Sequence, residues 1–245
     1  SIPWKWDESE KPLCAIEFDD KGKIEDSTAE THTDFSNRFP GGGALENDAF
    51  QEEILFAIKP ELIVSMALCS FMRDEESVLI HGALRFSNYS GYGSSFTFEG
   101  PFTPSSGPNS AAPTVLAIDA LQGMAKLQFN GDAFILRDLN KARVAFGGAR
   151  TLATGNWGCG AFGNDHVLKM VQQWMAASDA GVEHVYYHTF GDKRVGEVFS
   201  IARGFRGLPV KELWAAVQQA AKEAQKEMSA QAFRRALLAL TPKKN

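Results

Sequence analysis

Three consecutive glycines, Gly41 to Gly43, lead through a seven-residue loop into the sequence Gln51-Glu52-Glu53 and an apolar run. Without Cβ atoms, the backbone there can adopt positive φ and bring its N–H groups close to a polar ligand. The residues from Gln51 to Ile58 predict a short helix, and both glutamates fall in its first turn, where the helix dipole favours negative charge. The pattern fits a flexible loop followed by surface acids. It also fits a ligand-binding loop with two acidic groups.

A second glycine cluster, Gly158-Cys159-Gly160-Ala161-Phe162-Gly163, satisfies the pattern G-x-G-x-x-G and precedes a predicted amphipathic helix at Asp165–Ala177. Backbone N–H groups at a helix N-terminus bind a diphosphate whichever fold presents them. In a nicotinamide-dependent oxidoreductase the cluster would follow the first strand of a βαβαβ sheet, but only about one strand follows it here. The cluster therefore predicts a diphosphate site, and an oxidoreductase is the least favoured function.

Apolar runs and helical periodicity predict the other elements. Strands are expected at Pro12–Phe18, Thr31–Phe35, Ser77–His81, Ser94–Phe98, Thr114–Ala120 and Glu183–Phe190. Helices are expected at Asp132–Phe146, Lys193–Arg203, Pro209–Met228 and Gln231–Leu240. The chain from Ile24 is expected to return beside the first strand as a hairpin, and Glu61–Met72 is either a helix or a strand followed by a helix. Gly100–Pro113 is expected to be an exposed connection, and Arg85–Gly93 a loop with two tyrosines.

Composition sets broader bounds. With 245 residues and 44% hydrophobic content, the chain can bury a core in one large domain or in one domain with a helical appendage. A net charge of −5 argues against a generally basic nucleic-acid-binding surface, so we expect no direct DNA binding. No apolar run approaches the roughly 20 residues of a membrane span, and nothing at the N-terminus resembles a cleavable signal. Three widely spaced cysteines, Cys14, Cys69 and Cys159, fit a reduced intracellular setting and imply no metal site.

Three motifs together resemble one family. The three glycines, seven residues and Gln-Glu-Glu resemble the catalytic loop of the poly(ADP-ribose) glycohydrolases, macrodomain enzymes that cut the ribose–ribose bonds of poly(ADP-ribose). Thr33–Phe39, just ahead of the glycines, and Thr154–Gly163 resemble the same family in the same order. The resemblance covers roughly Pro12 to Phe205. Asn164 departs from it, because the family usually has another glycine there, and the C-terminal helices match poorly.

The resemblance implies a macrodomain-like three-layer α/β/α sandwich with a central mixed sheet and C-terminal helices. We expect residues 1–245 to form a single catalytic domain with a core at about 12–205 and a helical extension at 206–245. The implied activity is a glycosidase that releases ADP-ribose, with poly(ADP-ribose), ADP-ribose and poly-ADP-ribosylated proteins as partners. No cofactor, metal or membrane is expected. The expected setting is intracellular, in the nucleus or cytoplasm of a eukaryote.

Two residues are expected to be catalytic. Glu53 would protonate the departing 2′-oxygen as general acid and then activate water as general base. Glu52 cannot be an opposing carboxylate, because adjacent helical residues diverge by about 100°, and it would instead hold ribose hydroxyls with Asn37. The substrate-binding residues expected in addition are Asp34, Gly41, Gly42, Gly43, Gln51, Tyr92, Asn156, Gly158, Cys159, Gly160, Ala161, Phe162 and Phe190.

Within this set, the resemblance assigns particular groups of the ligand. The segment from Gly158 to Phe162 would cradle the diphosphate of ADP-ribose. Phe190 would lie against the adenine, and Tyr92 would close over it. Two other functions fit the same motifs. One is a macrodomain that binds ADP-ribose without cutting it, and the other is a hydrolase for single ADP-ribose units on proteins.

Overall fold

The computed structural model describes residues 4–46, 49–104, 112–122, 128–129, 131–192 and 196–243. The strands are β1 (Ala15–Asp19), β2 (Thr31–Asp34), β3 (Val78–Ile80), β4 (Ser87–Ser90), β5 (Thr97–Pro101), β6 (Thr114–Ala117), β7 (Thr151–Gly155) and β8 (His184–His188). The α-helices are α1 (Gln51–Ile58), α2 (Ile63–Leu68), α3 (Asp132–Ala145), α4 (His166–Ala180), α5 (Gly196–Phe205), α6 (Val210–Glu227) and α7 (Ala230–Leu240). Short 3₁₀ turns are η1 (Trp6–Glu8), η2 (Ile24–Asp26), η3 (Pro60–Leu62) and η4 (Gly93–Ser95).

Six strands form a mixed sheet in the order β1-β8-β7-β2-β6-β3. The first five are mutually parallel, and β3 pairs antiparallel with β6 at one edge. Parallel neighbours require crossover connections, which place helices against the faces of the sheet. This order is not the 3-2-1-4-5-6 order of the dinucleotide-binding fold. Among the described residues, no helix is long and apolar enough to cross a membrane.

Alternating side chains of the strands face two different cores, as the period of two in a strand requires. Leu116, Leu152 and Val185 point to the large core, which α3, α4, α5 and α6 cover. On the opposite face, Val115 packs against α1, and Ala153 packs against Ile24. The expected three-layer α/β/α sandwich around a mixed sheet is therefore confirmed.

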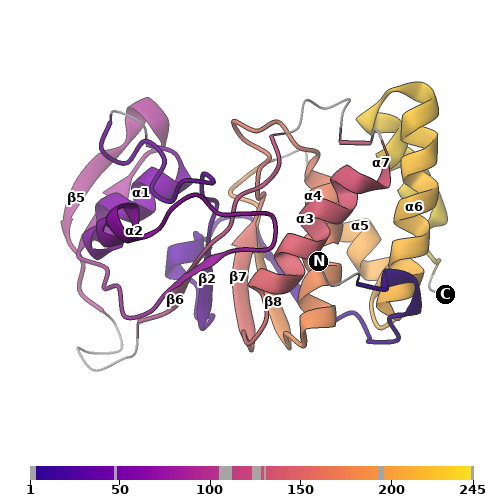
Figure 1. Ribbon diagram of the computed structural model, residues 1–245, viewed down its shortest axis with the longest axis horizontal. Coiled ribbons are helices and arrows are strands. Elements are labelled where there is room, and N and C mark those ends of the chain that lie inside the picture. Colours follow the sequence, from indigo (N-terminus) through magenta and orange to yellow (C-terminus); the bar gives the residue numbers. More distant parts are fainter. Residues whose placement is uncertain are drawn as a thin grey trace.

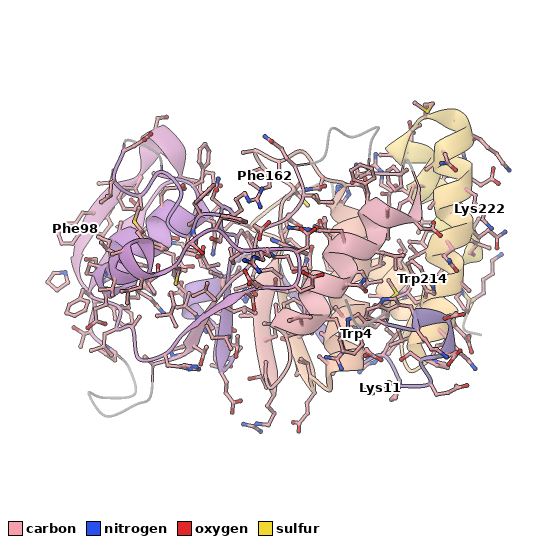
Figure 2. All side chains as sticks on the ribbon, in the orientation of Figure 1. Trp4, Lys11, Phe98, Phe162, Trp214 and Lys222 are labelled. Carbon is pink, nitrogen blue, oxygen red and sulfur yellow. The ribbon has the colours of Figure 1, made fainter. Side chains whose placement is uncertain are left out.

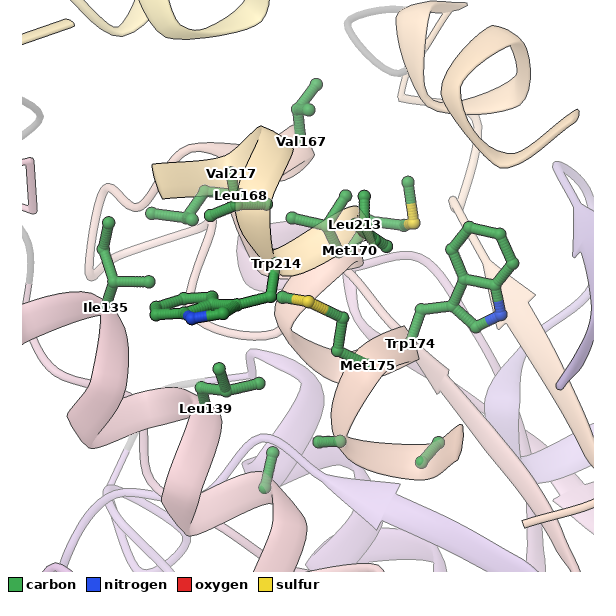
Figure 3. Close-up of a cluster of buried hydrophobic side chains, with 14 of the residues drawn as sticks. Ile135, Leu139, Val167, Leu168, Met170, Trp174, Met175, Leu213, Trp214 and Val217 are labelled. Atoms are coloured by element: carbon green, nitrogen blue, oxygen red, sulfur yellow. The ribbon is translucent and has the colours of Figure 1, made fainter. Parts of the chain in front are cut away.

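Helices α3, α4 and α6 converge in the large core (Figure 3). Trp174 and Met175 of α4 are fully buried, and Trp214 of α6 lies between them and Leu139 of α3. Burial of such side chains contributes about 1.5–3 kcal/mol each. The C-terminal helices thus share one core with the helices that flank the sheet. In Figure 1, α6 and α7 lie at one end of the molecule, while α1, α2 and β5 lie at the other.

Several expected elements are wrong or shifted. Ile24 does not return as a hairpin strand: it begins the 3₁₀ turn η2, and β1 pairs parallel with β8 instead. The strand expected as buried at Ser77–His81 is the exposed edge strand β3, whose Leu79 is 48% exposed. The tyrosine loop contains β4, which pairs with β5, and β5 starts at Thr97 rather than Ser94.

Other expectations are resolved or limited by the described residues. The ambiguous stretch after Pro60 forms the turn η3 and the short helix α2. Residues 105–111 of the expected connection, and residues 193–195 at the start of the expected helix before α6, lie outside the described residues. The helix Gln51–Ile58 is confirmed with the expected bounds.

The five parallel strands end at the same edge of the sheet. Asp19, Asp34, Ala117, Gly155 and His188 are their last residues. In α/β sheets, ligands bind in the crevice outside these carboxyl ends, where the loops after each strand meet. The segments that follow these residues therefore form the candidate site.

Candidate active site

A cavity of about 560 Å³ opens at this edge of the sheet. Most of its wall comes from residues 22–25, from residues 35–37, 42–43 and 50–55 around the glycine loop, from residues 156–162, and from residues 188–190 with Asp192. Tyr89, Tyr92 and Ala120 complete it. The volume suits a nucleotide-sized ligand, since small-molecule pockets are usually about 300–1,000 Å³.

Glu52 anchors the glycine loop from inside. It is 4% exposed, and its carboxylate accepts hydrogen bonds from the Ser36 hydroxyl (2.7 Å), the Asn37 N–H (2.8 Å) and the Gly41 N–H (2.6 Å). Burial raises the pKa of Glu52 to about 7, although these hydrogen bonds oppose the rise, and the charge of Glu53 adds to it. The first-turn acid that could have been a surface residue is instead the centre around which the loop is folded.

Glu53 lines the cavity and is half-buried. Its carboxylate accepts hydrogen bonds from the N–H groups of Gly43 and Phe50, both at 3.1 Å. The contact with Phe50 satisfies an orphan N–H at the start of α1, as in a capping box. Glu53 is therefore held by backbone donors rather than by a cation.

At Gly41 and Gly42, a side chain would clash with neighbouring atoms, and the backbone has a positive φ that favours glycine. Gly42 has φ +45°, and a Cβ there would stand 2.6 Å from Oε2 of Glu52 and 2.8 Å from Oε1 of Glu53. Gly41 has φ +101° and packs against Met66 of α2. Gly41 does not line the cavity, and its N–H supports Glu52 instead of reaching a ligand.

Asp34 lies behind the two glutamates. It is fully buried, and neither carboxyl oxygen has a hydrogen-bond partner among the described residues. Burial, together with the charges of Glu52 and Glu53, raises the pKa of Asp34 well above its usual range. Asp34 does not line the cavity, so the geometry gives no support to its expected contact with the substrate, which stays a prediction. All four residues of β2 are buried, so the side chain of its last residue, Asp34, lies inside the protein.

Gln51 and Asn156 line the cavity, but both amides also join segments of the protein. Gln51 accepts from the Phe35 N–H at 2.7 Å and donates to the Thr33 carbonyl at 3.0 Å, which ties α1 to the end of β2. Asn156 donates to the Thr189 carbonyl at 3.2 Å and accepts from the Tyr187 hydroxyl at 3.2 Å. These contacts fix the relative positions of the cavity walls.

The second glycine cluster presents unused donors. No described residue accepts a hydrogen bond from the N–H of Gly160, Ala161 or Phe162, and all three residues line the cavity. Figure 2 shows Phe162 about midway along the long axis of the molecule. Because these groups lie just before α4, they form an anion-binding arrangement of the kind found at helix N-termini.

Asn164 holds this loop in place. Its side-chain NH₂ donates to the carbonyls of Leu121 (2.8 Å) and Gly158 (2.9 Å), and its own N–H donates to Gly158 at 3.1 Å. Gly158 has φ +72°, and a Cβ there would stand 2.6 Å from that of Ala120. The residue that departs from the family pattern thus braces the loop, while Asp165 alone caps α4 through the N–H groups of residues 167 and 168.

A cluster of charged residues, Arg137 with the buried Asp138 and Lys169, packs next to the second glycine cluster. Asp138 accepts from Lys169 at 2.5 Å, from Arg137 at 2.8 Å and from the Leu121 N–H at 3.1 Å. The Lys169 ammonium lies 3.5 Å from the centroid of the buried Trp157 ring. Since Leu121 is also bonded to Asn164, the cluster and the loop form one connected network.

Aromatic side chains form the rim of the cavity. The ring centroids of Phe50 and Tyr92 are 5.8 Å apart, and those of Tyr92 and Phe190 are 5.9 Å apart. All three are between 43% and 53% exposed. Phe190 has φ +52°, a strained conformation for a bulky residue, which is typical of functional sites. Burial and the charge of Glu53 raise the pKa of the Tyr92 phenol.

Several cavity residues had no signal in the sequence. Lys23, Ile24 and Glu25 line the cavity from η2, and Glu25 accepts a hydrogen bond from the Tyr89 hydroxyl. Phe50 was not singled out either, although an aromatic residue just before two acids could have drawn attention. Among the described residues, no group of three or more His, Cys, Asp or Glu side chains is arranged to hold a metal ion.

We expect Gly160→Val to abolish ADP-ribose binding while leaving the fold intact. A Cβ at Gly160 meets no atom within 4 Å, so the branched side chain would project into the space where backbone N–H groups meet phosphate. Calorimetry with ADP-ribose and thermal melting of the same preparation measure both properties. Near-wild-type affinity in the folded variant would remove this loop from the binding site.

The buried carboxyls also predict how stability depends on pH. A carboxyl whose pKa is raised by folding binds its proton more tightly in the folded state, so the free energy of unfolding falls as pH rises. For Glu52 this loss spans pH 4.5 to about 7, between its ordinary and folded values. Asp34 contributes in the same direction from pH 3.8 upward. Each pKa unit is worth about 1.4 kcal/mol, or about 3 °C in a domain of this size.

Asp34→Asn tests this effect, because neither Asp34 oxygen has a hydrogen bond to lose. The variant is expected to melt higher than wild type at pH 8, with the difference shrinking toward pH 5. Melting temperatures measured across this range should therefore converge on the acidic side. Parallel curves for the two proteins would contradict the assignment of a raised pKa to Asp34.

Sequence comparison with known proteins identifies the poly(ADP-ribose) glycohydrolase family, which the three motifs resemble. The family model described as poly(ADP-ribose) glycohydrolase with a macro domain fold matches residues 3–197. The chain is 33% identical over 258 residues to the probable poly(ADP-ribose) glycohydrolase 2 of Arabidopsis thaliana, covering 85% of this chain and 49% of that protein. It is 35% identical over 210 residues to poly(ADP-ribose) glycohydrolase 1 of Caenorhabditis elegans, covering 77% of this chain and 26% of that protein.

The chain therefore spans about half the length of these curated relatives, or less. Among solved structures, one similar chain is the poly(ADP-ribose) glycohydrolase of Deinococcus radiodurans in complex with ADP-ribose. It is 16% identical, with 78% of this chain and 84% of that chain covered and a TM-score of 0.46.

Proposed function

Because the chain belongs to the poly(ADP-ribose) glycohydrolase family, we propose that it hydrolyses the ribose–ribose O-glycosidic bonds of poly(ADP-ribose) and releases ADP-ribose. One observation carries the proposal. A half-buried Glu53 and the unused N–H groups of Gly160, Ala161 and Phe162 line the same 560 Å³ cavity. A carboxyl group and an anion site in one cavity suit a ligand that has a sugar at one end and a diphosphate in the middle.

In the mechanism, Glu53 acts twice. As general acid it protonates the 2′-oxygen that leaves, while the anomeric carbon develops oxocarbenium character. The resulting carboxylate then takes a proton from the water that attacks this carbon, which regenerates the acid. Its backbone donors, Gly43 and Phe50, stabilise the carboxylate form between the two steps. The same side chain is thus returned to its starting state after each cycle.

Glu52 acts differently in this proposal. Three donors already converge on its carboxylate, so its position is fixed and it has little capacity left for proton transfer. We assign it, with Asn37, to orienting the ribose next to the scissile bond. Asp34 acts through its two neighbours, since it reaches no part of the cavity. Neutral Asp34 would spare the glutamates a third buried negative charge.

The rest of the ligand follows the shape of the cavity. The diphosphate lies on the N–H groups of the second glycine cluster, and the adenine lies against Phe190, with Tyr92 moving to close over it. The rim aromatics offer π faces of suitable size for a purine, and Tyr92 is linked to the catalytic loop because the Gly93 N–H donates to the Ala49 carbonyl at 2.8 Å. A motion of this loop would couple base binding to the position of Glu53.

The deciding experiment is incubation of the protein with poly(ADP-ribose), followed by chromatographic identification of the products. The expected product is free ADP-ribose. Binding of the polymer with no release of ADP-ribose would instead indicate a non-catalytic macrodomain. A parallel reaction with a mono-ADP-ribosylated protein tests the remaining alternative, since preferential release from that substrate would indicate a mono-ADP-ribosyl-protein hydrolase.

The wider assignments are proposals of the same kind. We propose that poly-ADP-ribosylated proteins are the macromolecular partners, that DNA is not bound directly, and that no membrane is involved. An intracellular location in the nucleus or cytoplasm fits a eukaryotic source. We also propose that residues 1–245 act as one catalytic domain, with 206–245 as a helical extension of the core at 12–205. The support is that Leu213 and Trp214 of α6 belong to the large core.

A further inference from the structure

The surface next to the catalytic loop carries an exposed cation and two exposed aromatic rings. Phe39 and Phe71 are 59% and 42% exposed, and their ring centroids are 5.9 Å apart. The Arg38 guanidinium lies 4.8 Å from the centroid of the Phe71 ring. We call these three residues the Arg38 cluster. Two neighbouring exposed rings with a guanidinium against one of them offer both a stacking surface and a cation at one place.

The Arg38 cluster is continuous with the cavity. The side-chain oxygen of Asn37, which lines the cavity, accepts a hydrogen bond from the Phe39 N–H at 3.1 Å. The two segments that form the cluster are joined because the Met72 N–H donates to the Arg38 carbonyl at 2.7 Å, and Met72 itself is buried. The rings are therefore carried by an anchored backbone beside the catalytic loop.

The chemistry of the polymer requires a second contact region there. In poly(ADP-ribose), the leaving 2′-oxygen belongs to a ribose whose adjacent carbon bears an adenine. The 5′ end of this adenosine ribose bears a diphosphate. When the terminal unit fills the cavity and its anomeric carbon reaches Glu53, the next unit must lie outside, close to Asn37 and the glycine loop. Its base and its phosphates are the first groups to meet the surface.

We propose that the Arg38 cluster is a subsite for this next ADP-ribose unit, an inference that rests on the proposed hydrolysis of the polymer. The adenine stacks on Phe39 and Phe71, since base–aromatic stacking is tolerant of geometry and contributes about 1–3 kcal/mol per base. Arg38 binds the diphosphate, because a guanidinium matches phosphate oxygens in a bidentate manner.

Charge supports this occupant. The protein carries a net charge of −5, so a cation beside two carboxylates is not part of a generally basic surface. No carboxylate of the described residues lies within 4 Å of the Arg38 guanidinium in an ion pair. Arg73, which follows Met72, is 75% exposed but forms an ion pair with Glu76 at 4.0 Å, so Arg38 is the cation on which the subsite depends.

The test compares three proteins on two ligands. A Phe39→Ala/Phe71→Ala double variant is expected to raise KM for poly(ADP-ribose) about ten-fold, with kcat changed less than two-fold. Its affinity for free ADP-ribose, measured by calorimetry, is expected to stay within two-fold of wild type, because ADP-ribose fills only the cavity. The matched control is Phe98→Ala. Phe98 is 63% exposed on β5, at the outer edge of the same end of the molecule (Figure 2), and is absent from the cavity lining, so its loss is expected to leave both values unchanged.

Arg38→Glu provides a second variant, which removes the cation over the Phe71 ring at an exposed position. It is expected to raise KM for the polymer more than Arg38→Lys does, and to weaken the dependence of KM on salt. A wild-type KM in the folded double variant would overturn the subsite while leaving the proposed function standing. An equal loss of affinity for free ADP-ribose would also overturn it, because the residues would then act through the cavity. If wild type releases no ADP-ribose from polymer, the proposed function fails and the subsite falls with it.

Discussion

Glu53→Gln is expected to lower kcat for hydrolysis of poly(ADP-ribose) by about 10²-fold or more, while affinity for ADP-ribose stays close to wild type. The amide has nearly the same shape as the carboxyl but cannot exchange a proton with the leaving oxygen or with water. It can still accept one of the two backbone hydrogen bonds that Gly43 and Phe50 now donate. Single-turnover rates and calorimetry on the same preparation separate the chemical step from binding.

Glu52→Gln is the matched control, because it makes the same change one residue away. With Glu52 as an orienting residue, its loss is expected to be milder in kcat and partly visible as weaker substrate binding. Three donors point at Glu52, so its amide would face an N–H group that it cannot satisfy. Wild-type turnover in folded Glu53→Gln would rule out the mechanism. A dead Glu52→Gln beside an active Glu53→Gln would exchange the two roles.

Gly42→Ala is expected to reduce kcat on the order of 10²-fold with little loss of folded structure. The added methyl group would stand 2.6 Å from Glu52 and 2.8 Å from Glu53, which is closer than non-bonded atoms allow. Both carboxyl groups must then move, and a displacement of about 1 Å at a reacting group can cost about 10²-fold. Steady-state kinetics with poly(ADP-ribose) would measure the loss.

Gly82→Ala separates this steric effect from backbone strain. Gly82 also has a positive φ, +81°, but a Cβ there meets no atom within 4 Å. It carries the same kind of conformational cost, roughly 1 kcal/mol, without touching the carboxylates. Both variants should therefore lose melting temperature, Gly42→Ala by more because of its clashes, but only Gly42→Ala should lose turnover. Equal turnover in both would mean that the loop yields without moving the glutamates.

The glycine loop and the helix α1 that follows it could be predicted well because their signals are local. Three glycines, two acids in a first turn and an apolar stripe determine the helix at Gln51–Ile58 from neighbouring residues alone, and the observed bounds agree. The second glycine cluster is similarly local, since it directly precedes α4. Such signals report on the backbone that a segment can adopt by itself.

The rest of the site depends on contacts that no local pattern encodes. The turn after Asp19 suggested a hairpin, but β1 found its partner in β8, about 170 residues later in the chain. This partnership places Ile24 and Glu25 in the cavity wall instead of in a strand. Likewise, nothing around Asp34 distinguishes a carboxyl that faces the ligand from one sealed behind it, because the difference lies in what packs over the strand end.

The pairing of β1 with β8 also sets when this site can exist during synthesis. Ala15–Asp19 are made early, but the strand that holds them, His184–His188, is made late. At about 5–20 residues per second, the catalytic loop waits on the order of ten seconds for Thr189 and Phe190 to leave the ribosome. Until then residues 188–190, which form the opposite wall of the cavity, are absent. A nascent or truncated chain would therefore hold Glu52 and Glu53 without the complete cavity, and on the proposed function ADP-ribose binding would begin only once the sheet is complete.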